Sequence, residues 1–182
     1  MDRSLVVRAQ KGDRVAFAQL VADYADRLFA VAARILRDPD AAGDVLQAVL
    51  VDIWRDIPTL RDPDRFEAWA HRLVINRCRA HFRSSRRQPM TLGLVPGDRS
   101  VGDAQVSVGN RDELERAFTR LSAEQRAVLV LTYYRDLSLG QVAESLGVSV
   151  GTVKSRLFAA RRAMRAALDA DERLVINEGR TA

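Results

Sequence analysis

A pair of short helical segments joined by a glycine turn, within residues 137–168, constrains the fold of this chain more than any other feature. Ser138 is placed to cap the first segment and Gln141 to reach back to it, which is the capping-box pattern of a helix start. Gly147 supplies the left-handed backbone conformation that ends a helix without steric cost. Ser149 is placed to cap the helix that follows. The spacing therefore predicts a helix-turn-helix.

The second helix of this pair carries basic side chains on its outer face. Val153 and Leu157 are expected to point inward, whereas Lys154 and Arg156 are expected to point outward. A cationic second helix after a glycine turn is typical of a helix-turn-helix that inserts this helix into the major groove of DNA. An αα-hairpin with a solvated basic face is the plainer alternative. The turn and the charge pattern together favour DNA binding.

Positive charge is concentrated in two separate stretches, although the net charge of the 182-residue chain is only +5. Residues 71–90 contain six arginines, residues 151–168 contain one lysine and four arginines, and neither stretch contains an acidic residue. Such patches are the electrostatic footprint of a surface that binds a polyanion. A membrane surface is the competing target, but neither patch belongs to a helix with a strongly exposed apolar face. The charge distribution therefore favours nucleic acid.

Apolar residues recur at helical spacing through the first half of the chain. Their steps of three and four residues predict helices over residues 15–37, 40–56 and 64–84. Strict alternation of apolar and polar residues is missing from these segments, so no strand competes with the helices. The three helices are expected to form one bundle.

The character of the sequence changes after this bundle. Proline, glycine and serine punctuate the next segment, which has no helical period and is expected to be a flexible linker. Another capping box, formed by Ser122 and Gln125, marks a helix that supports the helix-turn-helix. The predicted architecture is all-α. It consists of a first helical domain (residues 1–87), a linker (88–110), a helix-turn-helix domain (111–168) and a short acidic tail (169–182).

The sequence lacks the arrangements expected of an enzyme. Its single cysteine, Cys78, cannot form an internal disulfide and is expected to be a small core or boundary residue. We find no nucleophile–base set, metal-ligand cluster or phosphate-binding loop, so we expect no catalytic residue, metal or cofactor. Neither an apolar run of about 18 residues nor a signal-peptide core occurs, which predicts no membrane insertion and a cytoplasmic location.

The order and content of these segments resemble the bacterial RNA polymerase sigma factors of the extracytoplasmic-function (ECF) group, within the sigma-70 family. In the first domain the resemblance rests on FAQLVADYADRLFAVAARIL (17–36), DPDAAGDVLQAVLVDIW (38–54) and FEAWAHRLVINRCR (66–79), which look like region 2 of that family. In the second domain it rests on residues 121–164, which include GTVKSRL and look like region 4. The resemblance implies a non-catalytic factor that binds core RNA polymerase, recognises the −35 and −10 promoter elements and aids promoter melting.

The resemblance further implies that the helix over residues 40–56 docks on the clamp helices of core RNA polymerase. An amphipathic helix that carries apolar anchors and carboxylates suits a basic partner groove. The implied contact residues are Asp44, Val45, Gln47, Leu50 and Trp54. Burial in the core of the domain is the plainer alternative for Val45, Leu46, Val49 and Trp54. The chain departs from the family pattern at Gly43, Ala48 and Leu50.

The loop over residues 57–65 and the helix after it are implied to engage the −10 element. In the family this loop holds a base that is flipped out of the stack, and the helix binds the opened non-template strand. The implied contact residues are Arg61, Arg65, Arg72, Asn76, Arg77, Arg79 and Arg83, although any single arginine could instead be a solvated side chain. His81 stands where the family usually has aspartate. Trp69 fits the apolar stripe with Phe66 and is expected in the core.

The helix over residues 150–164 is implied to enter the major groove at the −35 element. The implied contact residues are Ser149, Thr152, Lys154, Ser155, Arg156, Phe158, Arg161 and Arg162. Arg156 suits a bidentate contact with guanine, whereas Arg161 and Arg162 suit phosphates. Phe158 would pack on the sugar-phosphate backbone or on a thymine methyl group, with core packing as the alternative.

The implied partners are core RNA polymerase, promoter DNA and a regulatory anti-sigma factor. Two other classes of protein share part of this pattern. A stand-alone helix-turn-helix regulator would carry a receiver or ligand domain upstream, and the blocks over residues 38–54 and 66–79 argue against it. A helical adaptor would bind proteins and use its basic patches only incidentally. Association with core polymerase separates a sigma factor from both.

Overall fold

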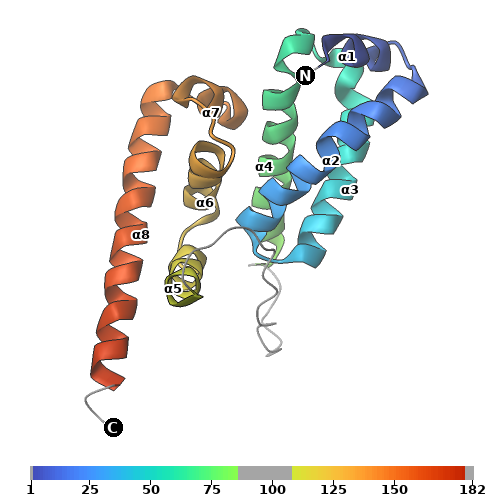
Figure 1. Cartoon of the computed structure of the whole chain (residues 1–182). Coiled ribbons are helices and arrows are strands. Elements are labelled where there is room, and N and C mark those ends of the chain that lie inside the picture. Colours follow the sequence, from blue (N-terminus) through green and yellow to red (C-terminus); the bar gives the residue numbers. More distant parts are fainter. Residues whose placement is uncertain (1, 86–107, 179–182) are drawn as a thin grey trace.

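Short polar side chains cap the helices where the sequence predicts that helices begin. The computed structural model describes residues 2–85 and 108–178 (Figure 1). In α2 (Arg14–Leu36) the Asp13 carboxylate accepts hydrogen bonds from the first backbone N–H groups, and Asp38 does the same for α3 (Pro39–Asp56). The predicted capping boxes of Ser122 and Ser138 are both confirmed, because each serine and the glutamine three residues later exchange hydrogen bonds.

The first helical unit consists of α1 to α4 with two short 3-10 turns between α3 and α4. Besides α2 and α3, this unit contains α1 (Arg3–Gln10), the turns Ile57–Thr59 and Pro63–Arg65, and α4 (Phe66–Ser85). α2 packs against α1, α3 and α4. In the core the ring of Tyr24 meets the ring of Phe66 edge-on, with centroids 5.2 Å apart. The three predicted helices are confirmed, and α1, which buries Val6 and Ala9, is an additional helix.

The second helical unit consists of α5 to α8. Its elements are α5 (Val108–Thr119), α6 (Ala123–Leu129), a π-helical turn (Val130–Tyr134), α7 (Leu139–Leu146) and α8 (Val150–Glu178). α8 packs against α5, α6 and α7. Gly147 joins α7 to α8 with φ of 66°, so the predicted left-handed turn is confirmed.

Two predicted segments, the acidic tail and the linker, need separate comment. α8 continues to Glu178, so residues 169–178 of the predicted acidic tail are helical. Most of the predicted linker, residues 88–107, lies outside the part of the chain that the structure describes. Throughout the described residues the regular structure is helical, which confirms the all-α fold class.

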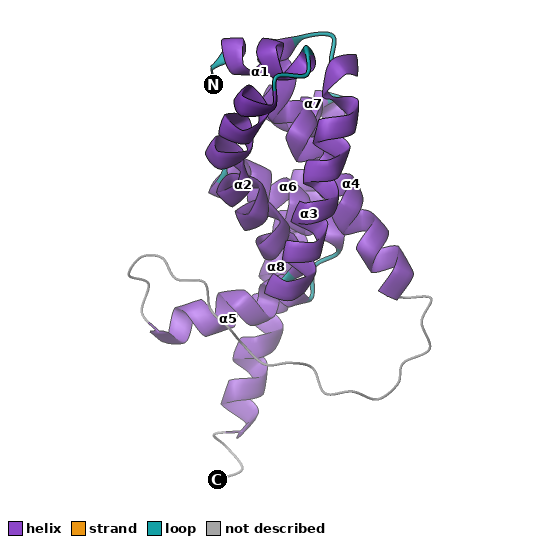
Figure 2. Cartoon of the chain, turned by 90° about the vertical axis from the view of Figure 1, so that its right-hand side faces the viewer, coloured by secondary structure: helices purple, strands orange, loops and turns teal. Residues whose placement is uncertain are grey.

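The two helical units lie side by side, with α4 of the first unit against α6 and α7 of the second (Figures 1 and 2). The C-terminal part of α2 also approaches α6 and the π-helical turn. Buried apolar side chains of both units form one continuous cluster. Helix α3 lies on the side of the first unit that faces away from the second unit.

Candidate nucleic-acid interface

Most of the residues predicted to engage the −10 element lie along one face of α4. Arg72, Asn76, Arg79 and Arg83 follow one another at steps of three or four residues, which places them on a single stripe of a helix. Arg65 precedes α4 in the second 3-10 turn, and Arg61 is exposed in the loop before it. The helix therefore presents a basic face, as expected for a surface that grips phosphates.

Arg77 lies on a different side of α4 and has a partner inside the first helical unit. Its guanidinium donates two hydrogen bonds to the carboxylate of Asp52 on α3, at 2.6 and 2.7 Å. Only 7% of the Asp52 side chain is exposed, and Arg55 also pairs with it at 3.2 Å. The hydrogen bonds to Asp52 raise the pKa of Arg77 above its ordinary value. Arg77 thus joins α4 to α3, a role that its sequence position does not reveal.

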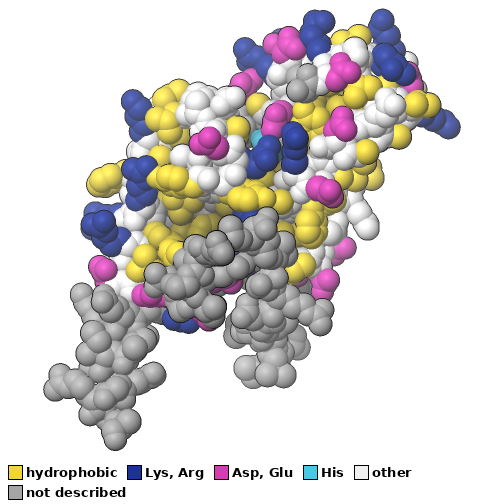
Figure 3. All heavy atoms as spheres, in the orientation of Figure 1, with side chains coloured by type: hydrophobic (Ala, Val, Ile, Leu, Met, Phe, Trp, Pro, Cys, Tyr) yellow, Lys and Arg dark blue, Asp and Glu magenta, His cyan; other side chains and the backbone are white. Residues whose placement is uncertain are grey.

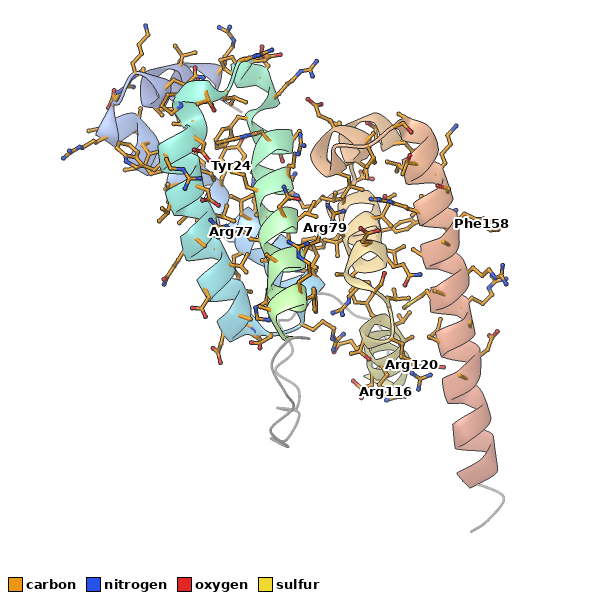
Figure 4. The ribbon with its side chains drawn as sticks, turned by 180° about the vertical axis from the view of Figure 1, so that it is seen from behind. Tyr24, Arg77, Arg79, Arg116, Arg120 and Phe158 are labelled. Carbon is orange, nitrogen blue, oxygen red and sulfur yellow. The ribbon has the colours of Figure 1, made fainter. Side chains whose placement is uncertain are left out.

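The second helical unit contacts part of the basic face of α4, although Asn76 and Arg83 of this face remain exposed. Arg65 pairs with Glu144 of α7 at 3.3 Å, and Arg79 pairs with Glu124 of α6 at 3.8 Å. The guanidinium of Arg72 lies against the turn between α7 and α8, where a Cβ added to Gly147 would be 3.0 Å from its central carbon. Burial lowers the pKa of Arg79 below its ordinary value. Figure 4 shows Arg79 between the two units.

The recognition helix α8 displays most of its predicted −35 residues to solvent. Ser149 caps it by accepting a hydrogen bond from the backbone N–H of Thr152, and Lys154 and Ser155 are exposed. Phe158 is 70% exposed and projects from the outer side of α8 (Figure 4), so it is not a core residue. An exposed aromatic ring on a basic helix can contact a thymine methyl group or a sugar.

The arginines of α8 differ in their contacts and in their exposure to solvent. Arg161 donates a hydrogen bond to the hydroxyl of Tyr133, while Arg162 is exposed. Arg156 instead folds back toward α6, where its Nη2 lies 3.7 Å from Glu124. Glu124 therefore neighbours both Arg79 of α4 and Arg156 of α8. The sequence did not single out this glutamate, because its two partners are distant along the chain.

The predicted polymerase-binding helix α3 has an exposed side that combines polar and apolar groups. Asp44 and Gln47 are exposed, Leu50 is half-buried, and Val45 is buried in the core. Trp54 is 42% exposed and stacks edge-on against Phe17, with ring centroids 4.7 Å apart, so it is a surface residue with one packed side. The burial of Val45 means that it supports this surface from beneath.

Sequence reasoning missed one apolar residue of the α3 surface. Val51 is 63% exposed beside this face. Its apolar side chain interrupts the polar side of the helix, and this interruption is the signal that could have identified it. Exposed apolar groups rimmed by polar side chains are typical of a protein–protein contact.

The boundary between the two units contains a buried histidine. His71 of α4 is only 1% exposed, and burial lowers its pKa to about 4. Beside it, Glu67 of α4 forms an ion pair at 2.9 Å with Arg135, which follows the π-helical turn. On the face drawn in Figure 3, basic and acidic side chains meet along this boundary. The second unit therefore attaches to the first through charged as well as apolar groups.

Some classes of site do not occur in the described parts of the chain. Among residues 2–85 and 108–178, no group of three histidine, cysteine, aspartate or glutamate side chains could hold a metal ion. None of the helices in these ranges combines the length and apolar character needed to cross a membrane. Cys78 is buried, and burial raises the pKa of its thiol to about 12, so the sulfur is a core group.

Comparison with known proteins identifies both units. Residues 20–88 match the model of sigma-70 region 2, and residues 111–164 match that of sigma-70 region 4. The chain is 34% identical to the RNA polymerase sigma factor CnrH of Cupriavidus metallidurans, over 93% of this chain and 95% of CnrH. It is 32% identical to the ECF RNA polymerase sigma factor SigM of Mycobacterium tuberculosis, over 88% of this chain and 81% of SigM.

A solved structure shows the same fold. CnrH in complex with the cytosolic domain of CnrY superposes with a TM-score of 0.69 and 31% identity, covering 93% of this chain and 98% of that chain. The similarity thus extends across both helical units and is not confined to the helix-turn-helix.

Proposed function

This chain belongs to the ECF group of the sigma-70 family of RNA polymerase sigma factors, and we propose that its two helical units divide promoter recognition between them. The first domain, residues 1–87, binds core RNA polymerase and the −10 element. The second domain, residues 111–168, binds the −35 element through its helix-turn-helix. The observation that carries this assignment is the pair of basic helices, α4 and α8, one in each unit.

At the −10 element, the basic stripe of α4 grips the opened strand. Arg72, Arg79 and Arg83 would contact phosphates, and Asn76 can exchange hydrogen bonds with a base. Arg61 and Arg65 lie in the loop that holds a flipped base. Arg77 contributes indirectly, because its ion pair with Asp52 holds α4 against α3.

At the −35 element, the outer side of α8 enters the major groove. Lys154, Ser155 and Phe158 lie on this side and are exposed. Ser149 and Thr152 present hydroxyl groups at the start of the helix, where backbone N–H groups also favour a phosphate. Arg156 can reach a guanine once it leaves Glu124, and Arg161 and Arg162 lie farther along for phosphate contacts.

Core RNA polymerase is bound through the exposed side of α3. Asp44, Gln47, Leu50 and Trp54 form this contact, with Val51 as a further apolar residue. An anti-sigma factor is the expected regulatory partner, and the similar CnrH was solved in complex with the cytosolic domain of CnrY. The factor works in the cytoplasm, beside the polymerase, and no catalytic step is assigned to it.

Run-off transcription with core RNA polymerase on a promoter library tests this function. The purified chain should direct transcripts from a subset of promoters, and Lys154→Ala should reduce them severalfold. The chain has one other lysine, Lys11, which is exposed at the end of α1, so Lys11→Ala is a matched control. Tight binding to duplex DNA without any association with polymerase would instead indicate a stand-alone regulator, and binding to neither would indicate an adaptor.

A further inference from the structure

Helix α1 lies over the end of the first unit where α3 ends and α4 begins (Figures 1 and 2). It packs against α2 and against both 3-10 turns of the loop over residues 57–65. Val6 and Ala9 are buried on its inner side, and Gln10 follows them at the edge of this buried face. The last residue of α1 therefore meets the loop that is proposed to hold a flipped base.

The side chain of Gln10 binds two backbone carbonyl groups of this loop. Its Nε2 donates hydrogen bonds to the carbonyl oxygen of Leu60, at 2.6 Å, and to that of Ile57, at 3.2 Å. An amide nitrogen carries two N–H groups, so one side chain can satisfy both acceptors. The backbone N–H of Leu60 also donates to the carbonyl of Ile57, at 3.1 Å, which closes the first turn. Gln10 thus binds both ends of this turn.

A second link joins α1 to the far end of the loop. Asp62 caps the second turn by accepting a hydrogen bond from the backbone N–H of Asp64 at 3.0 Å, and Arg3 of α1 pairs with the Asp64 carboxylate at 3.4 Å. The side chains of this ion pair are 63% and 64% exposed, and an exposed ion pair contributes little to stability. Gln10 is half-buried, so its hydrogen bonds are the firmer link.

The two links bracket Arg61, which is exposed between the turns and belongs to the proposed −10 set. Ile57 is 1% exposed, so the core anchors the start of the loop, whereas Leu60 is only half-buried and depends more on its hydrogen bond from Gln10. A loop that must become ordered on binding loses affinity to conformational entropy. Extrusion of a base from the stack has its own free-energy cost, so a loop that receives the base should be preformed.

Packing alone does not require a glutamine at this position. An apolar side chain could cover the loop at the edge of the buried face, but it would leave two carbonyl groups without this donor. A donor to the backbone fixes the course of the loop and leaves its side chains available to DNA. We propose that Gln10 is a positioning residue for −10 recognition, which holds the loop over residues 57–65 in the shape that receives the flipped base. The inference rests on the proposed function, since that function assigns the base to this loop.

Two substitutions of Gln10 test this role. Gln10→Ala removes the amide, and Gln10→Glu keeps the shape of the side chain but replaces the donor with a carboxylate, which only accepts hydrogen bonds. Gln19 is exposed on α2, so Gln19→Ala and Gln19→Glu are matched controls with the same changes of charge. Each variant is studied as the full chain bound to core RNA polymerase.

The measured quantity is the discrimination between bases at the −10 element. Fluorescence anisotropy gives the affinity for a labelled single-stranded oligonucleotide, taken from a promoter that the wild-type chain transcribes, and for copies with one base replaced. At the most sensitive position the replacement should weaken wild-type binding about tenfold. Both Gln10 variants should reduce this ratio to about threefold or less, whereas both Gln19 variants should keep the wild-type ratio. Binding to a −35 duplex should be unchanged in all of these variants.

A general structural role of Gln10 would give a different result. If its variants bound every oligonucleotide more weakly by the same factor, with an unchanged ratio, the proposal would be overturned. Circular dichroism checks that each variant is folded. Amide hydrogen exchange of the wild-type chain needs no variant: the amides of residues 57–60 should be protected, and exchange at the rate of an unstructured peptide would overturn the proposal as well.

The wild-type chain separates failure of this inference from failure of the proposed function. Its run-off transcription and its base preference do not depend on any variant. Discrimination that persists unchanged in Gln10→Ala and Gln10→Glu refutes the positioning role alone. Absence of transcripts from every promoter, or absence of any base preference in the wild type, refutes the proposed function and the inference with it.

Discussion

Arg77 and Arg79 are two residues apart on α4, and their different partners show how local geometry assigns roles to identical side chains. Arg77 faces α3 and forms a bidentate pair with the buried carboxylate of Asp52. Arg79 faces the second unit and only approaches Glu124, at 3.8 Å. A bidentate pair with a buried acid is costly to break, whereas a long pair with an exposed acid contributes little.

Arg77→Ala should therefore lower the free energy of unfolding by about 2 kcal/mol, because Asp52 would keep only its contact with Arg55. Urea denaturation measures this change. Arg83→Ala, at an exposed position of the same helix, should change stability by less than about 0.5 kcal/mol. An unchanged stability for Arg77→Ala together with weaker DNA binding would return Arg77 to the DNA-binding set.

Phe158 is the second residue whose environment makes a sharp prediction. Because its ring is 70% exposed, Phe158→Ala should leave stability within about 0.5 kcal/mol of the wild type. The same variant should weaken binding to a −35 duplex about tenfold. Its buried neighbour Leu157 is a contrast, since Leu157→Ala should cost about 2 kcal/mol or more of stability. A large loss of stability in Phe158→Ala would place the ring in the core.

The burial of His71 predicts how the free energy of unfolding depends on pH. Burial lowers its pKa from 6.5 to about 4 in the folded chain, with Glu67 and Arg135 as its charged neighbours. Well above pH 6.5 this residue is neutral in both the folded and the unfolded chain, so it has almost no effect on stability. As the pH falls toward 4, only the unfolded chain binds the proton, and stability decreases by about 2 kcal/mol at pH 5.

Denaturation of the wild type and of His71→Gln at pH 7 and pH 5 isolates this effect from the titration of carboxylates. The variant should lose less stability than the wild type over this interval, since glutamine does not titrate. Equal losses in the two proteins would show that His71 is protonated or exposed in the folded state.

At the scale of elements, helices could be predicted from the sequence because their determinants are local. Asp13, Asp38, Ser122 and Ser138 cap helices within three residues of themselves, and the apolar spacing fixes which face is buried. The positions of the helices relative to one another depend on contacts between distant residues. Arg126 and Ile35 are 91 residues apart, and no spacing rule links them.

The candidate site likewise has features that the sequence predicts and features that only the fold reveals. The basic stripe of α4 and the exposed outer side of α8 follow from helical periodicity, which is visible in the sequence. Periodicity does not show that Arg77 is engaged by Asp52, that Val45 is buried, or that Glu124 neighbours two arginines. These features depend on which helix lies opposite, and the fold alone supplies that information.

The turn between α7 and α8 predicts how a substitution of Gly147 changes stability. Gly147 has φ of 66°, and an alanine there would adopt a strained conformation and press against Arg72. Gly147→Ala should lower the free energy of unfolding by about 1 kcal/mol or more. Gly43 in α3 is the matched control, because nothing lies within 4 Å of an added Cβ, and Gly43→Ala should stabilise the helix by up to about 1 kcal/mol. Thermal unfolding of both variants compares the two effects, and equal shifts would contradict the left-handed turn.

At the scale of the whole molecule, the three binding surfaces differ in their accessibility. The side of α3 and the outer side of α8 are open. On the basic face of α4, Arg72 and Asn76 are exposed, whereas Arg79 lies against the second unit. A chain with a net charge of +5 attracts nucleic acid wherever its basic groups are free.

The accessibility of α3 predicts that polymerase binding can be lost while the chain stays folded. Trp54 is exposed on α3, the helix that lies on the side of the first unit away from the second. Trp54→Ala should therefore weaken binding to core polymerase about tenfold or more, as expected for an aromatic anchor of an interface. The loss of its contact with Phe17 should cost about 1 kcal/mol of stability, which leaves the chain folded.

Pull-down of core polymerase and small-angle scattering measure the two properties of the same variant. The radius of gyration of free Trp54→Ala should equal that of the wild type, as expected for a chain that remains folded. Phe158→Ala, an exposed aromatic substitution on the other unit, serves as a control that retains polymerase binding. If Trp54→Ala bound polymerase normally, the docking surface would have to lie elsewhere on the chain.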